Sequence, residues 1–152
     1  MAEESEYYTE STVPLQLIRL ARKFPEQLIS QIKKGTHTED YVNHSVISQR
    51  LLQICGAYDW DTEVVYSENV PVAIKGTLTL EIDGQEVMVS GIGSDQGNQN
   101  KNIGDKLKEM ESDALKRAAS KVGCGLHLWA QNQYFLYTQL KEEFEVSDED
   151  VR

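Results

Sequence analysis

The sequence has 152 residues, of which 15 are Lys or Arg and 25 are Asp or Glu, so its formal net charge is -10. This length is typical of one domain, and an apolar content of 39% is enough for a hydrophobic core, which excludes a disordered or fibrous class. The apolar runs are too short for a membrane-spanning helix, and the first residues, MAEESEYYTE, lack the regions of a signal peptide. We therefore expect a cytoplasmic protein that contacts no membrane.

The acidic residues are concentrated at the two ends of the chain. Residues 1–13 carry a net charge of -4 and residues 142–152 a net charge of -5, whereas residues 14–141 carry only -1. We therefore expect one domain over 14–141 between two acidic tails, the second of them disordered. Two segments of the domain, 16–34 and 101–121, are rich in bases. Such segments are typical either of solvated helix faces or of a surface that binds a polyanion.

The first part of the domain has the apolar spacing of helices. Residues 15–34 predict two short helices that meet at Pro25, which begins the second. Residues 41–56 predict another helix, with Asn43 or Ser45 as its N-cap and a glycine as its end.

Alternating apolar residues then predict a three-stranded antiparallel meander. Its first strand covers residues 60–66, and residues 72–92 form a hairpin around the two-residue turn Asp83-Gly84. The polar segment 93–104, rich in Gly, Asn and Gln, predicts a long mobile loop.

Helical periodicity returns after this loop. Residues 107–122 predict a long helix with one apolar side, and residues 126–144 predict a terminal helix. The predicted fold class is therefore α+β, with a three-stranded antiparallel meander followed by a long packed helix (a β-β-β-α core) and with flanking helices.

No motif in the sequence indicates catalytic or metal chemistry. Cys124 and His127 have a C-x-x-H spacing, but a zinc site needs three or four ligands, so we expect a core thiol beside a surface histidine. The other cysteine is Cys55, and both are expected to be free thiols of a reducing compartment. We predict a protein that is not an enzyme and has no catalytic residue, no cofactor and no metal.

The glycine-rich segment and the basic helix after it are informative together. Gly91, Gly93 and Gly97 are typical of a flexible loop, or of one whose backbone N–H groups approach phosphates, although the Lys-Ser/Thr ending of a P-loop is missing. Four cations follow and supply positive charge: Lys101, Lys116, Arg117 and Lys121. This combination predicts a groove that follows a nucleic-acid backbone.

From Phe24 to about Trp129 the chain resembles the single-strand annealing proteins of the Rad52 type, including their phage and DdrA relatives. The resemblance is carried by FPEQLI, by YVNHSVISQRLLQICGAYDW, by the strand exit GIGSDQG and, most specifically, by KEMESDALKRAASKVGCGL. It implies a curved sheet with a long helix packed on it, assembled into a homo-oligomeric ring or arc with single-stranded DNA in a basic groove. The implied activity is annealing of complementary strands in homologous recombination and DNA repair.

The resemblance also implies partners, a location and a set of DNA-binding residues. The partners are single-stranded DNA and other copies of the chain, with a single-strand-binding protein as a further candidate. The implied location is the nucleoid of a prokaryotic or phage-infected cell. Five cations are implied to bind DNA: Lys116, Arg117, Lys121, Lys101 and Arg50. Ser45 and Ser120 stand where the family has basic residues, which implies weaker or more salt-sensitive binding.

Two observations bear on assembly and regulation. Glu111 falls within the apolar arc of its helix, where an unpaired buried charge is costly, so either a partner subunit or solvent must satisfy it. The acidic segment Glu142 to Asp150 either competes with DNA as a flexible tether or only keeps the protein soluble. Two other functions remain open: protection of DNA 3′ ends without efficient annealing, and a protein-interaction module whose acidic tails imitate nucleic acid.

Overall fold

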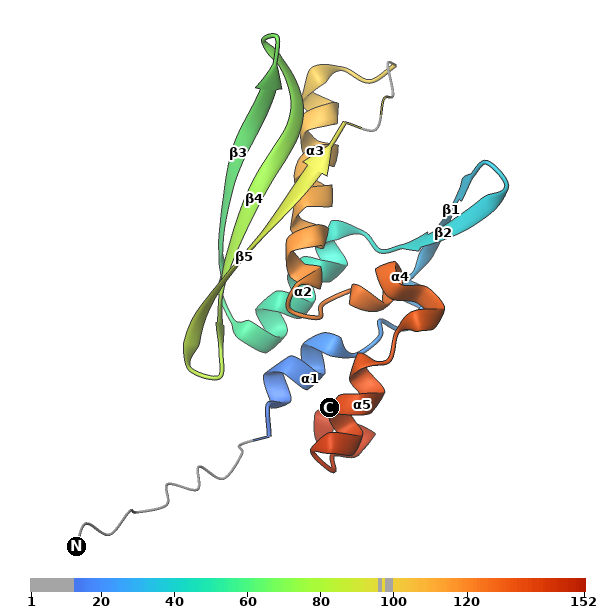
Figure 1. Cartoon of the computed structure of the whole chain (residues 1–152), viewed down its shortest axis with the longest axis vertical. Helices are drawn as coiled ribbons and strands as arrows, with labels where there is room; N and C mark the ends of the chain where they lie inside the picture. Colours follow the sequence, from blue (N-terminus) through green and yellow to red (C-terminus); the bar gives the residue numbers. More distant parts are fainter. Residues whose placement is uncertain (1–12, 96, 98–99) are drawn as a thin grey trace, which may run out of the picture.

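The computed structural model describes residues 13–95, 97 and 100–152, which form an α+β fold. A three-stranded antiparallel sheet, in the order β3-β4-β5, carries the long helix α3 on one face (Figure 1). The smaller helices gather at one end of this unit, and the hairpin β1–β2 extends away from it (Figure 1). The predicted class and the meander with its packed helix are thus confirmed.

The sheet follows the sequence pattern closely. Its strands are β3 (Asp59–Ser67), β4 (Val70–Ile82) and β5 (Gln85–Ser94). Alternate residues of β4 are buried from Ile74 onward, because they face α3 and the core. Asp83 and Gly84 both have positive φ, 51° and 76°, as the type I′ turn of a two-residue hairpin requires.

Helix α3 (Ile103–Ser120) lies unusually close to strand β5. The side chain of Asn102 caps the helix by accepting the backbone N–H of Asp105 at 2.9 Å. Gly91 and Gly93 face the helix, and a Cβ atom built on Gly93 would lie 1.9 Å from the carbonyl oxygen of Met110. Only glycine permits this approach of two backbones. Both glycines therefore belong to a strand under a helix: Gly91 lies in the predicted hairpin over residues 72–92, whereas the prediction that placed Gly93 in the loop over 93–104 is wrong.

Two helices complete the core at one end of the sheet. They are α1 (Leu15–Ala21) and α2 (His44–Cys55), and the side chain of Asn43 caps α2 by accepting the backbone N–H of Ser45. The predicted helix over residues 41–56 is confirmed. Three fully buried leucines join the helices to the sheet: Leu20, Leu51 and Leu78.

The second helix predicted between residues 15 and 34 is wrong. After α1 the chain forms a short 3-10 turn, η1 (Glu26–Leu28), and then the hairpin of β1 (Ser30–Lys34) and β2 (His37–Tyr41). All five residues of β1 are exposed, so the apolar spacing there has no core to pack against. Gly35, with a φ of 63°, closes the hairpin in a conformation that a helix excludes.

The segment after α3 contains several short helices instead of the single helix predicted over residues 126–144. It consists of α4 (Leu126–Ala130), η2 (Gln131–Gln133), α5 (Leu136–Glu143) and α6 (Asp148–Val151). The chain breaks at Gln131, whose φ is 52°, and the hydroxyl of Tyr134 then donates to the carbonyl oxygen of Ala21. A long-range contact with α1 therefore interrupts the helical pattern.

The C-terminal segment is ordered, so the prediction of a disordered tail is wrong there. Ser147 and Asp150 form a reciprocal capping box at the start of α6, and the side chain of Val151 is only 1% exposed. The Nε of Arg19 donates to the carbonyl oxygen of Val151 at 2.9 Å. A segment held in this way is no flexible tether, which contradicts the alternative in which it competes with DNA as one.

Other sequence predictions fall on residues outside the described ranges. The first acidic tail lies there almost entirely, and so do residues 96 and 98–99 of the expected loop. Strand β5 continues to Ser94 and α3 begins at Ile103, so the connection is shorter than the predicted 93–104. Within the described residues, no helix is both long enough and apolar enough to cross a bilayer.

Candidate nucleic-acid interface

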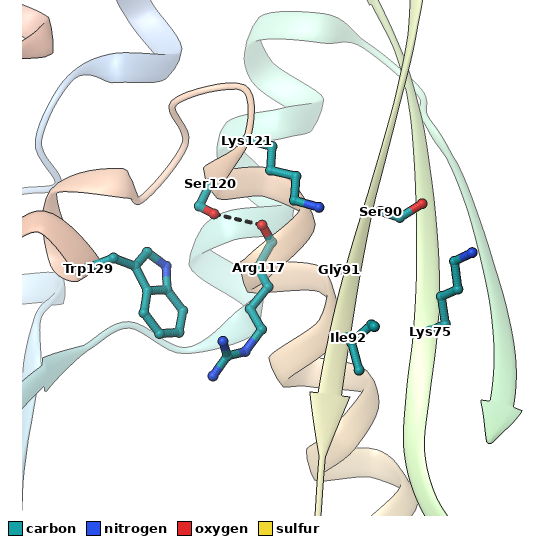
Figure 2. A pocket seen from close by; sticks show the side chains of 8 residues that line it. All are labelled: Lys75, Ser90, Gly91, Ile92, Arg117, Ser120, Lys121 and Trp129. Carbon is teal, nitrogen blue, oxygen red and sulfur yellow. Dashed lines mark hydrogen bonds between the residues drawn. The ribbon is translucent and has the colours of Figure 1, made fainter. Parts of the chain in front are cut away.

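A hollow of about 400 Å³ opens where the C-terminal end of α3 passes the edge strand β5 (Figure 2). Helix α4 borders the hollow on the side of α3 opposite the strands. Strands β4 and β5, the C-terminal end of α3 and helix α4 all contribute to it. The described residues that line this basic hollow are Lys75, Ser90, Gly91, Ile92, Arg117, Ser120, Lys121 and Trp129. Segments far apart in the sequence thus meet at one surface.

The C-terminal end of α3 provides the two cations at the centre of the basic hollow, with Arg117 in the last turn and Lys121 as the C-cap residue. Arg117 and Lys121 are four residues apart, so they lie on the same side of the helix. Gly91 allows that side to approach β5, because a Cβ atom built on it would lie 3.0 Å from the Cβ of Arg117. Figure 2 shows Lys121 extending toward Ser90 and Arg117 extending toward Trp129. The close packing of helix on strand therefore positions the cations at the sheet edge.

The basic hollow is positively charged in a protein of net charge -10. Among the described residues that line it, three are cationic and none is acidic. The Nε of Arg117 donates to the Oδ2 of Asp113 at 2.9 Å. Within the described part of the chain, Lys75 and Lys121 form no ion pair, although Glu63 is the cross-strand neighbour of Lys75. Two unpaired ammonium groups beside a guanidinium create a local attraction for anions.

Two neighbouring residues of α3 each lie over an exposed aromatic ring. The guanidinium carbon of Arg117 is 4.7 Å from the ring centroid of Trp129, and the Nζ of Lys116 is 5.6 Å from that of Tyr41. Burial lowers the pKa of Lys116, while the nearby Asp113 carboxylate acts in the opposite direction. Lys116 does not line the basic hollow and instead points toward the base of the β1–β2 hairpin.

The two remaining predicted DNA-binding cations lie elsewhere. Lys101 forms an ion pair with Glu109 at the other end of α3. Arg50 is half-buried, with its guanidinium carbon 4.0 Å from the ring centroid of Phe24, and it donates to the carbonyl oxygen of Arg22. Burial lowers the pKa of Arg50. The structure therefore brings Arg117 and Lys121 together and separates Lys116, Lys101 and Arg50 from them.

Sequence reasoning missed four of the residues that line the basic hollow: Lys75, Ser90, Ile92 and Trp129. Lys75 occupies an outward position on a strand whose inward positions are apolar, and this alternation is the signal that exposes it. No sequence signal indicated that Trp129 is exposed, because the single helix predicted over residues 126–144 gave no reason to place this tryptophan outside the core. Ser120, which stands where the resemblance implies an arginine, lines the basic hollow and donates to the carbonyl oxygen of Arg117 at 2.6 Å.

Cys124 and His127 form part of the core. His127 is 8% exposed, so the expectation of a surface histidine is wrong, and its Nε2 accepts the backbone N–H of Phe24 at 3.1 Å. Burial lowers the pKa of His127 to about 4 and raises the pKa of the Cys124 thiol to about 12. The described residues contain no group of three or more side chains that could hold a metal ion.

Glu111 does not require a partner subunit. It is exposed, and its Oε1 accepts the indole N–H of Trp60 at 3.2 Å. Because β3 carries Trp60 over the helix at this point, the carboxylate has both a hydrogen bond and access to water. The solvent alternative is therefore correct for this residue, and any argument for assembly must come from other surfaces.

Comparison with protein-family models identifies the family to which this fold and surface belong. Residues 15–146 match the family model described as the Rad52/22 family double-strand break repair protein. This range includes every described element from α1 to α5 and all the residues that line the basic hollow. Among curated proteins, none matches the chain.

Proposed function

We propose that this chain, which belongs to the Rad52/22 family of double-strand break repair proteins, binds single-stranded DNA at the basic hollow and promotes the annealing of complementary strands. Membership of the family gives the chain a role in DNA recombination and repair. The observation that supports DNA binding at this surface is the convergence of Lys75, Arg117 and Lys121 without an acidic lining residue in the described part of the chain.

Annealing at such a surface requires no catalytic group. The cations would hold phosphates, while base pairing itself drives the joining of two strands. The protein concentrates and aligns the strands, which converts a bimolecular encounter into a more favourable local one. A surface that binds the backbone of either strand suits this role, because phosphate contacts carry no sequence information.

We also propose that the chain acts as a homo-oligomer, in which neighbouring hollows form a continuous path for DNA. The face of the sheet away from α3 exposes apolar side chains outside the basic hollow, among them Val65 and Met88, and Met88 is 63% exposed. Strands β3 and β5 are the two edges of the sheet, and open edges readily pair with other chains. Light scattering at micromolar concentration, with and without DNA, tests this: a strict monomer in both conditions would contradict assembly.

The DNA-binding proposal is tested by oligonucleotide titration at several salt concentrations. Lys121→Ala is the most direct variant, because the ammonium group of Lys121 forms no ion pair within the described part of the chain. Arg117→Ala/Lys121→Ala removes two contacts and should weaken binding and flatten the slope of log K against log salt by roughly 1.4, at about 0.7 per contact for single strands.

Lys108→Ala/Lys33→Ala is the matched control. It removes the same charge, but Lys108 lies half a turn out of phase with Arg117 on α3 and Lys33 lies on the exposed β1–β2 hairpin. Equal losses in both double variants would show a general charge effect and contradict the site. Absence of oligonucleotide binding by the wild type would favour the protein-interaction alternative, and binding without annealing of complementary strands would favour protection of DNA ends.

A further inference from the structure

Trp129 is the residue of the basic hollow that phosphate binding alone does not explain. It belongs to the five-residue helix α4, and its side chain is 47% exposed. Burial of a tryptophan is strongly stabilising, so a half-exposed indole leaves a large apolar area in water. In this position the ring borders a cluster of cations, which is a surface typical of single-stranded nucleic-acid binding.

Arg117 holds the indole in a defined orientation. Its guanidinium carbon lies 4.7 Å from the ring centroid, and its Nε donates to Asp113 at 2.9 Å. Asp113, Arg117 and Trp129 therefore form a chain of contacts that begins on the body of α3 and ends at the ring. An aromatic surface fixed before the ligand arrives loses less conformational entropy on binding.

The basic hollow can accept both parts of a nucleotide. Its volume, about 400 Å³, falls within the range of small-ligand sites. In Figure 2 the indole lies on one side of Arg117, while Ile92, Ser90 and Lys75 lie on the other, and Lys121 extends toward Ser90. A flat base against the indole would leave its neighbouring phosphates near Lys121 and Lys75.

From this arrangement we infer that Trp129 stacks against one nucleobase of the bound strand while the surrounding cations hold the adjoining phosphates. This inference rests on the proposed binding of single-stranded DNA and adds selectivity to it. A base within a duplex is already stacked on both faces, so the indole contacts only an unpaired base. Trp129 thereby favours single-stranded over double-stranded DNA, which phosphate contacts alone do not.

The test compares a thymidine oligonucleotide with an abasic oligonucleotide of equal length. Trp129→Leu keeps an apolar side chain but removes the ring, and it should weaken binding of the thymidine strand by roughly fivefold to a hundredfold. Binding of the abasic strand and of duplex DNA should stay at the wild-type level. Trp129→Phe keeps a ring for stacking and should retain most of the affinity.

Fluorescence gives a second measurement, because the chain has only two tryptophans, Trp60 and Trp129. The Trp60→Phe variant leaves Trp129 as the only indole, and its emission should be quenched by the thymidine strand but not by the abasic strand. Trp129→Leu, in which only Trp60 emits, should show no such quenching.

The outcomes separate this inference from the proposed function. Equal weakening of thymidine and abasic strands by Trp129→Leu would show that Trp129 only supports Arg117, and it would overturn stacking. Wild-type affinity for both strands in that variant would also overturn stacking while leaving phosphate binding intact. Failure of the wild type to bind any oligonucleotide would instead refute the proposed function itself.

Discussion

Gly93 lies in β5 directly beneath α3, and replacing it by alanine should both destabilise the fold and displace the basic hollow. The added methyl carbon would lie 1.9 Å from the carbonyl oxygen of Met110 and 2.8 Å from the backbone N of Ala114. Non-bonded carbon and oxygen atoms pack no closer than roughly 3 Å, so α3 must move away from β5 by about 1 Å or more. The obstructing atoms belong to helix backbone, which has no rotamer to change.

This displacement should lower the free energy of unfolding by about 3 kcal/mol, the upper part of the range for overpacked cores. For a chain of this length that loss corresponds to roughly 6–12 °C in Tm. Because the same helix carries Arg117 and Lys121, affinity for single-stranded DNA should also fall in the fraction that remains folded. Urea unfolding followed by circular dichroism gives the free energy, and oligonucleotide titration at a temperature below the transition gives the affinity.

Gly104→Ala is the matched control, since it makes the same chemical change in the first turn of α3. A Cβ atom there would meet only the Asn102 side chain, at 3.3 Å, so the variant should match or slightly exceed the wild type in stability. An unfolding free energy of Gly93→Ala within about 0.5 kcal/mol of the wild type would refute the close packing of α3 on β5. Equal destabilisation by both substitutions would do the same.

Three further predictions concern the core, the C-terminal segment and the helix cap. Burial lowers the pKa of His127 from 6.5 to about 4, so the unfolded chain takes up a proton at a higher pH than the folded chain does. The free energy of unfolding should therefore decrease as the pH falls from 6.5 to about 4, by at most about 1.4 kcal/mol per pH unit. Urea unfolding of His127→Gln at several pH values should lack this part of the pH dependence. Val151→Ala should lower stability by roughly 1–2 kcal/mol in thermal melts, whereas a disordered tail would leave Tm unchanged. Asn102→Ala should cost about 1 kcal/mol because it removes the cap of α3, and a Tm equal to the wild type would contradict the cap seen at Asp105.

The elements that sequence analysis identified correctly are those with strong local signals. Asp83 and Gly84 favour a tight hairpin turn wherever they occur between alternating strands, and the helices α2 and α3 have both an apolar period and an asparagine cap. These preferences act between residues close in sequence, so they are visible without the fold. The family resemblance read from the helix motif is likewise confirmed by the match over residues 15–146.

The failures occur where distant contacts outweigh local preference. The spacing between residues 15 and 34 suits a helix, but no core covers that face and the chain forms an exposed hairpin. The acidic C-terminal segment has the composition of a disordered tail. It is nevertheless ordered, because Arg19 of α1 donates a hydrogen bond to the carbonyl oxygen of Val151 and the Val151 side chain is buried. The contacts between α1 and the C-terminal segment cannot be inferred from composition, because they join residues more than a hundred positions apart in the sequence.

In the candidate site too, some residues are placed by local sequence signals and others by contacts between distant segments. The sequence is enough to predict that Arg117 and Lys121 share one side of a helix, because both fall at the end of the predicted helix over residues 107–122 and helical geometry places residues four apart together. Lys75 and Trp129 lie beside these two cations because of contacts between distant parts of the chain. The absence of side chains at Gly91 and Gly93 lets α3 approach the edge of β5, and this approach brings two strands and α4 around the end of the helix. The positive surface exists because backbones pack closely there, and that packing depends on the whole fold.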